Sequence, residues 1–325
     1  MNFIRRKPWD PLLHTLTDES VYRSRAYHRR AFLASLGFAA GSMALGCGEH
    51  KPNEEKLKAA ATIDVPEASK EIYPAKRNEL FEYGRDETPQ QTAAIYTNFY
   101  EFSLSKQTYL YVDRFQPTPW EVKVDGLCNQ PMTFDLDDLH AKFTFEERAY
   151  RHRCVETWAM CVPWTGFPLA ALLRMVEPEP TAKYVQFQSF NRPTEAENIA
   201  DQSFPWPYTE SVTMAEAMND LAFIATGIYG EPLPKQHGAP VRLVLPWKYG
   251  FKSGKSIVRI TLTGKQPNTF WNTVNPREYG FEANVDPAVP HPRWSQSEEW
   301  MLGTRERFRT QKFNGYGDYV AKLYS

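Results

Sequence analysis

Short predicted strands and short predicted helices follow one another in no regular order along this chain, and this irregularity constrains the fold most. Alternating or β-branched runs predict strands at 120–126, 184–188, 241–245 and 257–262, and apolar periodicity predicts helices at 135–142, 168–175 and 213–218. A doubly wound sheet would need strands and helices in alternation, and no internal repeat is visible. We therefore expect an α+β fold with mixed sheets and short helices.

Two of the predicted helices carry start signals. Thr213 and Glu216, three residues apart, form a capping box. Pro168 suits the first position of a helix, and Leu169, Leu172 and Leu173 follow it on one face. Both helices should therefore begin where these residues stand.

The composition supports a substantial hydrophobic core and argues against one class of partner. Of the 325 residues, 42% are hydrophobic and nine are Trp. The 38 basic and 39 acidic residues leave a net charge of −1. Proteins that bind nucleic acid normally show a basic excess or a basic stripe. We expect no nucleic-acid partner.

The first 46 residues have the features of an export signal. Arg29 and Arg30 precede an apolar run that ends near Gly46 and is shorter than the roughly 20 residues that span a bilayer. The pattern resembles a twin-arginine signal peptide over residues 1–46, with an amphipathic N-terminal helix as the alternative. The twin-arginine route carries folded proteins, so it predicts a cofactor inserted before export to the periplasm.

The next segment connects this signal to the globular part. Cys47 ends a run that fits a lipoprotein cleavage box, so either Cys47 is lipidated or plain cleavage occurs nearby. Residues 47–92 are rich in Lys, Glu, Pro and Ala and predict a tether or a surface strap. The globular domain should span 93–325.

The four cysteines, Cys47, Cys128, Cys154 and Cys161, contain no CxxC pair and no zinc-ligand spacing. A disulfide between Cys128 and Cys161 stays open for an oxidising compartment.

Cys154 is the leading candidate for chemistry. It follows Arg151, His152 and Arg153 at the end of a short polar run that predicts an exposed strand or turn. Cationic neighbours lower the pKa of a thiol, and the thiolate is the form that binds metals. A single soft sulfur donor favours a thiophilic metal over magnesium or calcium. Together with the export signal, this favours a redox metal centre over the alternative of a buried structural cysteine.

A Lys- and Gly-rich loop is the second candidate. Gly250–Ser256 reads G-x-x-x-G-K-S, one residue shorter than a P-loop, and it leads into a strand where a P-loop opens a helix. We therefore reject nucleotide hydrolysis. The loop still suits an anion site built from backbone N–H groups and Lys, with a solvated hairpin loop as the alternative. Arg242, at the start of the preceding strand, could pair with a phosphate or pterin oxygen.

Seven segments carry a family resemblance. In chain order they are Asn98-Phe99-Tyr100-Glu101-Phe102, Arg153-Cys154-Val155-Glu156-Thr157-Trp158, Pro163-Trp164-Thr165-Gly166-Phe167-Pro168-Leu169, Gly238-Ala239-Pro240-Val241-Arg242-Leu243, Pro246-Trp247-Lys248-Tyr249-Gly250-Phe251-Lys252, His291-Pro292-Arg293-Trp294-Ser295-Gln296 and Phe313-Asn314-Gly315-Tyr316. From about residue 95 to the C-terminus the chain thus resembles the sulfite oxidase-fold molybdopterin enzymes. Within them it is most similar to catalytic subunits of periplasmic protein-methionine-sulfoxide reductases.

The resemblance implies a set of cofactor residues. Cys154 matches the molybdenum thiolate ligand. The remaining cofactor contacts implied are Asn98, Tyr100, Glu101, Ser189, His237, Arg242, Ser253, Gly254 and Lys255. Three positions depart from the family pattern: Ser189 stands where Thr is usual, His237 stands where Asn is usual, and Cys161 is unusual for its position.

The resemblance also implies an activity. It implies one molybdenum–molybdopterin cofactor per chain and reduction of sulfoxides, notably methionine sulfoxide in periplasmic proteins, by oxygen-atom transfer to the metal. Electrons would come from quinol through a membrane haem b subunit, and the twin-arginine translocase would export the folded protein. Two alternatives stay open. One is sulfite oxidation, which usually comes with a C-terminal dimerisation domain for which this chain has no room after the matched region; the other is a cofactor-free secreted binding protein.

Overall fold

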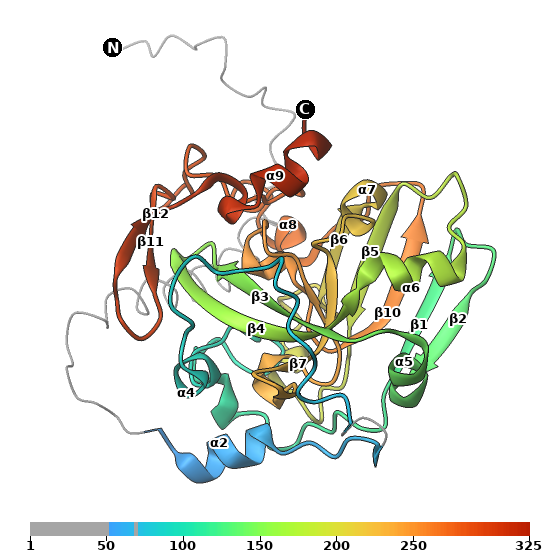
Figure 1. The fold of residues 1–325 in the computed structure, drawn as a ribbon, viewed down its shortest axis with the longest axis horizontal. Helices are drawn as coiled ribbons and strands as arrows, with labels where there is room; N and C mark the ends of the chain where they lie inside the picture. The colour runs from blue at the N-terminus through green and yellow to red at the C-terminus, as the bar shows by residue number, and fades with distance from the viewer. Residues whose placement is uncertain (1–51, 68–70) are drawn as a thin grey trace, which may run out of the picture. The chain divides into compact units, whose positions relative to one another are not determined.

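Short strands and short helices build the part of the chain that the computed structural model describes, residues 52–67 and 71–325 (Figure 1). The strands are β1 (Glu121–Gly126), β2 (Met132–Asp135), β3 (Glu146–Arg153), β4 (Trp158–Pro168), β5 (Tyr184–Ser189), β6 (Thr209–Thr213), β7 (Phe223–Ile228), β8 (Glu231–Pro232), β9 (Arg242–Val244), β10 (Ile257–Thr263), β11 (Glu298–Met301) and β12 (Arg307–Arg309). The α-helices are α2 (Glu54–Ala61), α4 (Gln90–Ala94), α5 (Leu136–Lys142), α6 (Leu169–Val176), α7 (Met214–Ala217), α8 (Phe270–Val274) and α9 (Gly317–Val320). Short 3-10 turns are η3 (Thr108–Leu110), η4 (Glu197–Ala200), η5 (Lys235–His237), η6 (Gly250–Lys252), η7 (Lys312–Gly315) and η8 (Ala321–Leu323).

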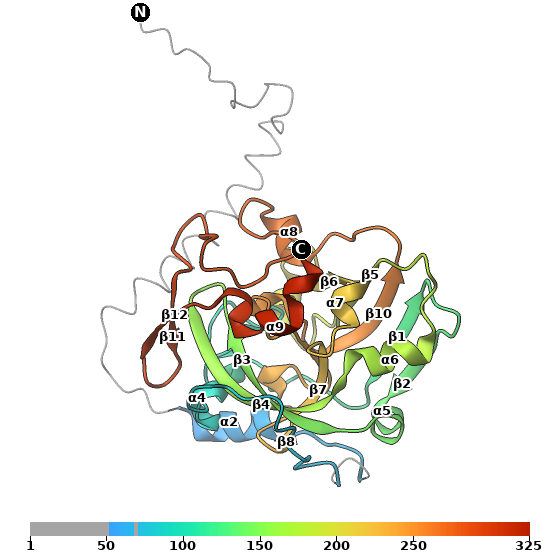
Figure 2. The same cartoon turned by 45° about the horizontal axis from the view of Figure 1, so that its top comes forward.

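The described strands form two mixed sheets. The smaller sheet has the order β2-β1-β10-β5-β6, and the larger has the order β12-β11-β4-β7-β8, with β3 also paired to β4 and β9 to β7. The β1–β10 and β11–β4 pairs are parallel and lie within otherwise antiparallel sheets. The β11–β12 hairpin and the β1–β2 pair lie at opposite ends of the domain in both views (Figures 1 and 2). The predicted α+β class with mixed sheets and short helices is confirmed.

The local signals placed most elements correctly. The strands predicted at 120–126 and 184–188 are β1 and β5, and the capping box of Thr213 and Glu216 is present at the start of α7. Pro168 is an exception. It is the last residue of β4 and the N-cap of α6, so it ends a strand instead of occupying the first helical turn.

The two strands around the Lys- and Gly-rich loop do not form a hairpin. The run predicted at 241–245 contains β9, which pairs with β7 in the larger sheet, whereas the run at 257–262 is β10, which pairs with β1 and β5 in the smaller sheet. The loop therefore crosses between the sheets and is buried: Lys252 is fully buried and donates to the carbonyl of Ser211 at 2.7 Å. The solvated-hairpin alternative is wrong.

Strand β4 is the centre of the larger sheet. Its first ten residues are buried, and it pairs with β3, β7 and β11. A strand covered on both faces reads as a continuous apolar run, which explains why its sequence gave no alternating signal. Because β3 is paired along the whole of its length to β4, the turn between them is held firmly, and this turn carries Cys154.

The segment before residue 93 belongs to the same compact unit, which spans Pro52–Ser325. The side chain of Asn53 caps α2, and Lys56 of that helix pairs with Asp113. Further on, Arg77 bonds to the Glu147 carboxylate at 2.8 Å, and Phe81 is buried. The compact unit thus includes residues that precede the expected start of the globular domain near residue 93.

The signal peptide expected at 1–46 and Cys47 lie outside the described residues. Within the described ranges, none of the helices has the length and apolar character that a membrane crossing requires.

Candidate active site

Cys154 occupies the tight turn between β3 and β4. Its backbone N–H donates to the carbonyl of Trp158 at 2.9 Å, and Thr157 adopts a left-handed conformation with φ of 72°. The side chain is 5% exposed. The Asn98 amide nitrogen and the Glu156 backbone nitrogen each lie 3.5 Å from the Cys154 sulfur. The thiol therefore sits inside the domain, held by two N–H donors that suit a thiolate.

The cations that flank Cys154 in sequence do not activate it. Arg151 extends to Gln311 at 2.9 Å, and Arg153 is fully buried against Glu299, also at 2.9 Å. Burial and Glu156 raise the pKa of the Cys154 thiol to about 12, which Lys106 and Arg153 only partly oppose. The predicted exposed turn with a cation-lowered thiol pKa is wrong. A bound metal ion is the kind of partner that would convert such a thiol to thiolate.

A charged pair stands beside the sulfur. Lys106 forms an ion pair with Glu156 and donates to the Asn98 amide oxygen at 2.6 Å. The Trp158 indole N–H also donates to Glu156, at 3.2 Å. Although burial opposes it, Lys106 holds the pKa of Glu156 below its usual value, so this carboxylate is charged next to the thiol. The network fixes the Asn98 side chain with its amide nitrogen toward the sulfur.

A basic cluster, formed by His237, Arg242 and Lys255, lies where β9 meets the loop between the sheets. Arg242 is 2% exposed, donates to the His237 carbonyl at 2.9 Å and stacks on Trp164, with 4.5 Å from its guanidinium carbon to the ring centre. Burial and Arg242 lower the pKa of Lys255 to about 7, while Glu101 and Cys154 act in the opposite direction. The same electrostatic neighbours, Arg242 and Lys255, together with burial, lower the pKa of His152 well below its usual value. The basic cluster is therefore adjacent to the Cys154 turn.

Glycines allow close approach inside this cluster. A Cβ on Gly250 would overlap the imidazole of His152, and Gly238, with φ of 98°, lies against the side chain of Lys255. The backbone N–H groups of Gly254 and Lys255 have no acceptor among residues 52–67 and 71–325. Free N–H groups beside Lys are the elements of an anion-binding nest, as expected from the sequence.

Comparison with known proteins identifies the family. Residues 109–271 match the family model described as the oxidoreductase molybdopterin binding domain. The chain is 43% identical over 302 residues to the protein-methionine-sulfoxide reductase catalytic subunit MsrP of Burkholderia mallei, covering 91% of this chain and 89% of that protein. It is 47% identical over 261 residues to the MsrP of Ralstonia nicotianae, covering 77% and 78%, and 43% identical over 317 residues to that of Xanthomonas axonopodis pv. citri, covering 95% and 94%.

The chain belongs to the family of protein-methionine-sulfoxide reductase catalytic subunits. This confirms the resemblance found in the seven segments. Among solved structures, the sulfane dehydrogenase SoxCD from Paracoccus pantotrophus matches with a TM-score of 0.42 and 20% identity, covering 68% of this chain and 57% of that one.

Buried polar atoms that lack a hydrogen-bond partner test whether this chain can hold a molybdopterin. The atoms around the basic cluster that lack a hydrogen-bond partner are Arg242 Nη2, Gln236 Nε2 and Oε1, and Trp164 Nε1. Leaving such a group buried and unsatisfied costs about 1–3 kcal/mol. A pterin with an anionic phosphate end offers both donors and acceptors, so this set fits the cofactor.

Five of the nine cofactor contacts expected besides Cys154 lie at or near the Cys154 turn. Asn98 lies directly on Cys154, and His237, Arg242, Gly254 and Lys255 form the basic cluster. Their proximity agrees with a shared role, and their function as cofactor contacts stays a prediction.

The other expected residues are engaged within the protein. Ser189 donates to the Glu101 carboxylate at 2.7 Å, and the Ser253 hydroxyl accepts from the Leu245 N–H at 3.1 Å. Tyr100 packs its ring on Trp271, with 4.9 Å between centres. The hydroxyl that Ser189 retains thus orients Glu101, whose charge in turn faces Lys255.

Sequence reasoning missed two residues of the site. Lys106 organises Asn98 and Glu156, and Gln236 contributes an unsatisfied buried amide. Neither stands in a motif: Lys106 follows a Ser-Leu-Ser loop, and Gln236 resembles a surface residue of a Pro-Lys-Gln-His turn. Only the packing of loops against the β3–β4 turn reveals them.

Cys128 and Cys161 are both buried free thiols. The disulfide that the sequence left open between them is not formed in this structure.

Proposed function

We propose that this chain reduces methionine sulfoxide residues in proteins, with one molybdenum–molybdopterin cofactor per chain. The overall reaction takes two electrons and two protons and yields methionine and water. The bound cofactor supplies the two-electron redox chemistry that removes the sulfoxide oxygen. The observation that carries the proposal is the pairing of a buried thiol, Cys154, with a buried basic cluster that contains unsatisfied polar atoms, in a chain of the MsrP family.

The residues of this chain would divide the work. Cys154 would bind the metal through its thiolate, with Asn98 and the Glu156 backbone N–H donating to the sulfur. Arg242, Lys255 and the free N–H groups of the loop would hold the anionic end of the pterin. Because Cys154 is buried, these contacts would act in a medium of low dielectric constant, where they are stronger than in water.

Molybdenum analysis and a substrate screen test this function. Protein purified from its own host should contain about one molybdenum per chain and reduce methionine-sulfoxide peptides with a chemical electron donor. Sulfite and small non-peptide sulfoxides belong in the same screen. Protein without molybdenum would contradict the cofactor assignment, and metal-loaded protein that oxidises sulfite but reduces no sulfoxide would contradict the reaction.

The variant Cys154→Ser tests the metal ligand. A hydroxyl is a harder and far less acidic donor than a thiol, so we expect loss of activity and an altered metal spectrum. The fold should survive because the two side chains have similar size, and circular dichroism with thermal unfolding measures this. Retained activity together with an unchanged metal spectrum would contradict the assignment.

We further propose a periplasmic location and a membrane partner. The Arg29-Arg30 signal supports export of the folded protein by the twin-arginine translocase, and the neighbouring Cys47 supports a lipid anchor. A catalytic subunit implies a second subunit, and we propose a membrane haem b protein that passes electrons from quinol. Oxidised periplasmic proteins would be the substrates. Co-purification of a haem protein from solubilised membranes, and its reoxidation by the loaded catalytic subunit, test the partner.

A further inference from the structure

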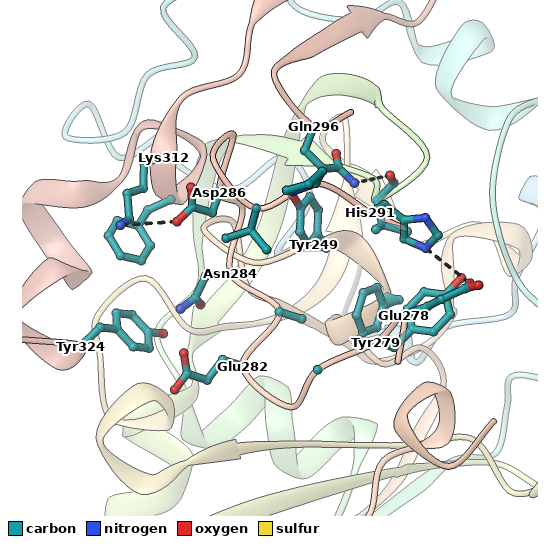
Figure 3. A pocket seen from close by; sticks show the side chains of 17 residues that line it. Tyr249, Glu278, Tyr279, Glu282, Asn284, Asp286, His291, Gln296, Lys312 and Tyr324 are labelled. Atoms are coloured by element: carbon teal, nitrogen blue, oxygen red, sulfur yellow. Dashed lines mark hydrogen bonds and ion pairs between the residues drawn. The ribbon is translucent and has the colours of Figure 1, made fainter. Parts of the chain in front are cut away.

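A cleft of about 320 Å³ is lined by Tyr249, Tyr279, His291 and Tyr324, among other residues (Figure 3). Its walls come from loop 278–291, from the η6 segment and from the C-terminal region. Several of the residues that line it are aromatic, namely Tyr249, Phe251, Tyr279, Phe313 and Tyr324. Aromatic faces attract cations as well as apolar groups, so this lining suits a long cationic side chain.

One wall of the cleft is attached to the turn that carries Cys154. Val155, whose Cα is about 3.8 Å from that of Cys154 as for any consecutive pair, lines the cleft. The side chains of Trp294 and Gln296 both donate to the Val155 carbonyl at 2.8 Å, so this wall is fixed to the turn that carries the thiol. Tyr279 lines the cleft as well. Burial is the main cause of the raised pKa of its hydroxyl, and Glu278, Glu156 and Cys154 add to it.

Carboxylates exceed cations among the lining residues. Glu278, Glu282 and Asp286 line the cleft together with one lysine, Lys312. Asp286 pairs with Lys312 at 3.4 Å, and Glu278 pairs with Arg293 at 2.8 Å from outside the lining. His291 is buried and its pKa is lowered to about 4 by burial, so it adds no positive charge at neutral pH.

Glu282 is the third lining carboxylate, and it differs from the other two in its ion pairing. It is exposed and has no cation within ion-pair distance in the described part of the chain. Lys248 interacts with Glu282 electrostatically, but its ammonium group bonds to Glu216, to Asn284 and to the Glu282 main-chain carbonyl. Val289, which also lines the cleft, is 63% exposed and offers an apolar contact.

We infer that the cleft holds a lysine or arginine side chain of the protein substrate, a few residues from the methionine sulfoxide, with Glu282 as its ion-pair partner. This inference rests on the proposed function, since it names a preference of the same site. An extended peptide advances about 3.3–3.6 Å per residue, and Val155 belongs both to the thiol turn and to the cleft lining, so a basic residue a few positions from the sulfoxide is the one expected to enter the cleft.

Matched peptides test the preference on the loaded enzyme. Two methionine-sulfoxide peptides would differ only in Lys or Gln two residues from the sulfoxide, and a third would carry Glu. An exposed ion pair typically contributes a factor of about 1.4 to 5. We expect kcat/KM to be about two- to fivefold higher for the Lys peptide, mainly through KM because the contact is the same before and during the reaction. The difference should shrink in 0.5 M salt.

Three variants connect the preference to the cleft. Glu282→Gln should abolish it, and Glu282→Lys should reverse it in favour of the Glu peptide. Glu121→Gln, which removes an exposed carboxylate on β1 in the smaller sheet, is the matched control and should leave the preference for the Lys peptide intact. Equal kcat/KM for the three peptides with the wild-type enzyme, or a preference that survives in Glu282→Gln, would overturn the inference.

A binding measurement separates this inference from the proposed function. Methionine-sulfone analogues of the same peptides cannot be reduced in the same way, and fluorescence anisotropy measures their affinity for the loaded protein directly. If no sulfoxide peptide is reduced, the proposed function fails, while tighter binding of the Lys analogue that Glu282→Gln removes would still support the cleft. If all peptides are reduced but neither KM nor affinity depends on charge, the cleft inference fails alone.

Discussion

At the scale of the residue, burial decides the chemistry of this site. The sequence places Arg151 and Arg153 beside Cys154, but Arg151 bonds to Gln311, and Arg153 bonds to Glu299 and to the Cys154 backbone carbonyl. Neither guanidinium bonds to the sulfur, and burial raises the pKa of the thiol. Burial also lowers the pKa of Lys255 to about 7 and that of Arg242 to about 9, so an anion bound beside them would favour their charged forms. A thiol and a basic cluster that are both poorly solvated would each be stabilised by a ligand that carries a metal at one end and a phosphate at the other.

Replacing Arg242 tests the anionic end of this arrangement. Losing one partner of a charge-assisted hydrogen bond costs about 1.5–3 kcal/mol, so Arg242→Ala should lower cofactor occupancy about tenfold or more under limiting supply. Activity per bound molybdenum should change much less, as metal analysis combined with turnover will show. Arg259→Ala, on the exposed face of β10, is the control and should load normally. Full occupancy with a collapse of activity per metal would mean that Arg242 faces the substrate.

The lowered pKa of Lys255 predicts how the cofactor-free protein responds to pH. Its folded pKa is about 7 against an ordinary value of 10.5, so between these values the unfolded chain binds more protons than the folded one. The free energy of unfolding of the apoprotein should therefore rise as the pH rises from about 7 to 10. Lys248, whose pKa burial lowers to about 8, contributes with the same sign.

Urea unfolding of the apoprotein between pH 7 and 9.5 measures this slope. Lys255→Met should flatten it, since the variant has no such proton to release. The loaded protein should also show a flatter slope, because a bound phosphate keeps Lys255 charged. An identical slope in wild type and variant would show that Lys255 is not held in this way.

At the scale of the element, the β3–β4 turn is held in place by an ion network that reaches β11. Arg153 at the end of β3 bonds to Glu299 of β11, which also pairs with Arg85, and both Arg153 and Glu299 are almost completely buried. Asn314 adds a second fastening by donating to the Arg151 carbonyl at 3.0 Å and to the Pro246 carbonyl at 2.9 Å. The late Phe313–Tyr316 segment thus positions the turn that carries Cys154 and the loop that carries Tyr249.

Breaking this network should lower the free energy of unfolding. Glu299→Gln leaves two buried guanidinium groups without a counter-charge, which typically costs about 3–5 kcal/mol in the free energy of unfolding. Glu298→Gln, one residue earlier on the same strand, removes an exposed carboxylate whose partner Arg307 lies at 3.5 Å, and it should cost less than about 1 kcal/mol. Chemical denaturation of both variants measures the difference. Equal losses would show that the buried network does not fix β11 to the turn.

At the scale of the whole molecule, loading and export should be coupled. The expected cofactor contacts come from segments as distant as Asn98 and Lys255, so the site would be complete only in the folded chain. The proposed twin-arginine route carries folded proteins, so it would allow the cofactor to be inserted before export. The chain-wide similarity to the MsrP relatives agrees with one catalytic domain that works with a second subunit.

Substituting Lys for both Arg29 and Arg30 tests the route. The paired arginines are the recognised feature of the signal, so the double variant should leave folded, molybdenum-loaded precursor in the cytoplasm and remove most of the mature protein from the periplasm. Cell fractionation with immunoblotting gives the distribution, and metal analysis of the cytoplasmic fraction shows whether loading precedes export. Normal amounts of mature protein in the periplasm would rule out the twin-arginine signal.

The sequence by itself determined the features that depend on neighbouring residues. Strands β1, β5 and β10, the capping box at Thr213 and the family segments around Cys154 could all be predicted, because periodicity, caps and motifs are local. Only the tertiary structure decided what is brought together across the chain. It put β9 and β10 in different sheets, buried the loop between them and added Lys106 and Gln236 to the site. It also set the pKa of Cys154, because desolvation and the direction of a long side chain depend on packing between segments far apart in sequence, which no local pattern encodes.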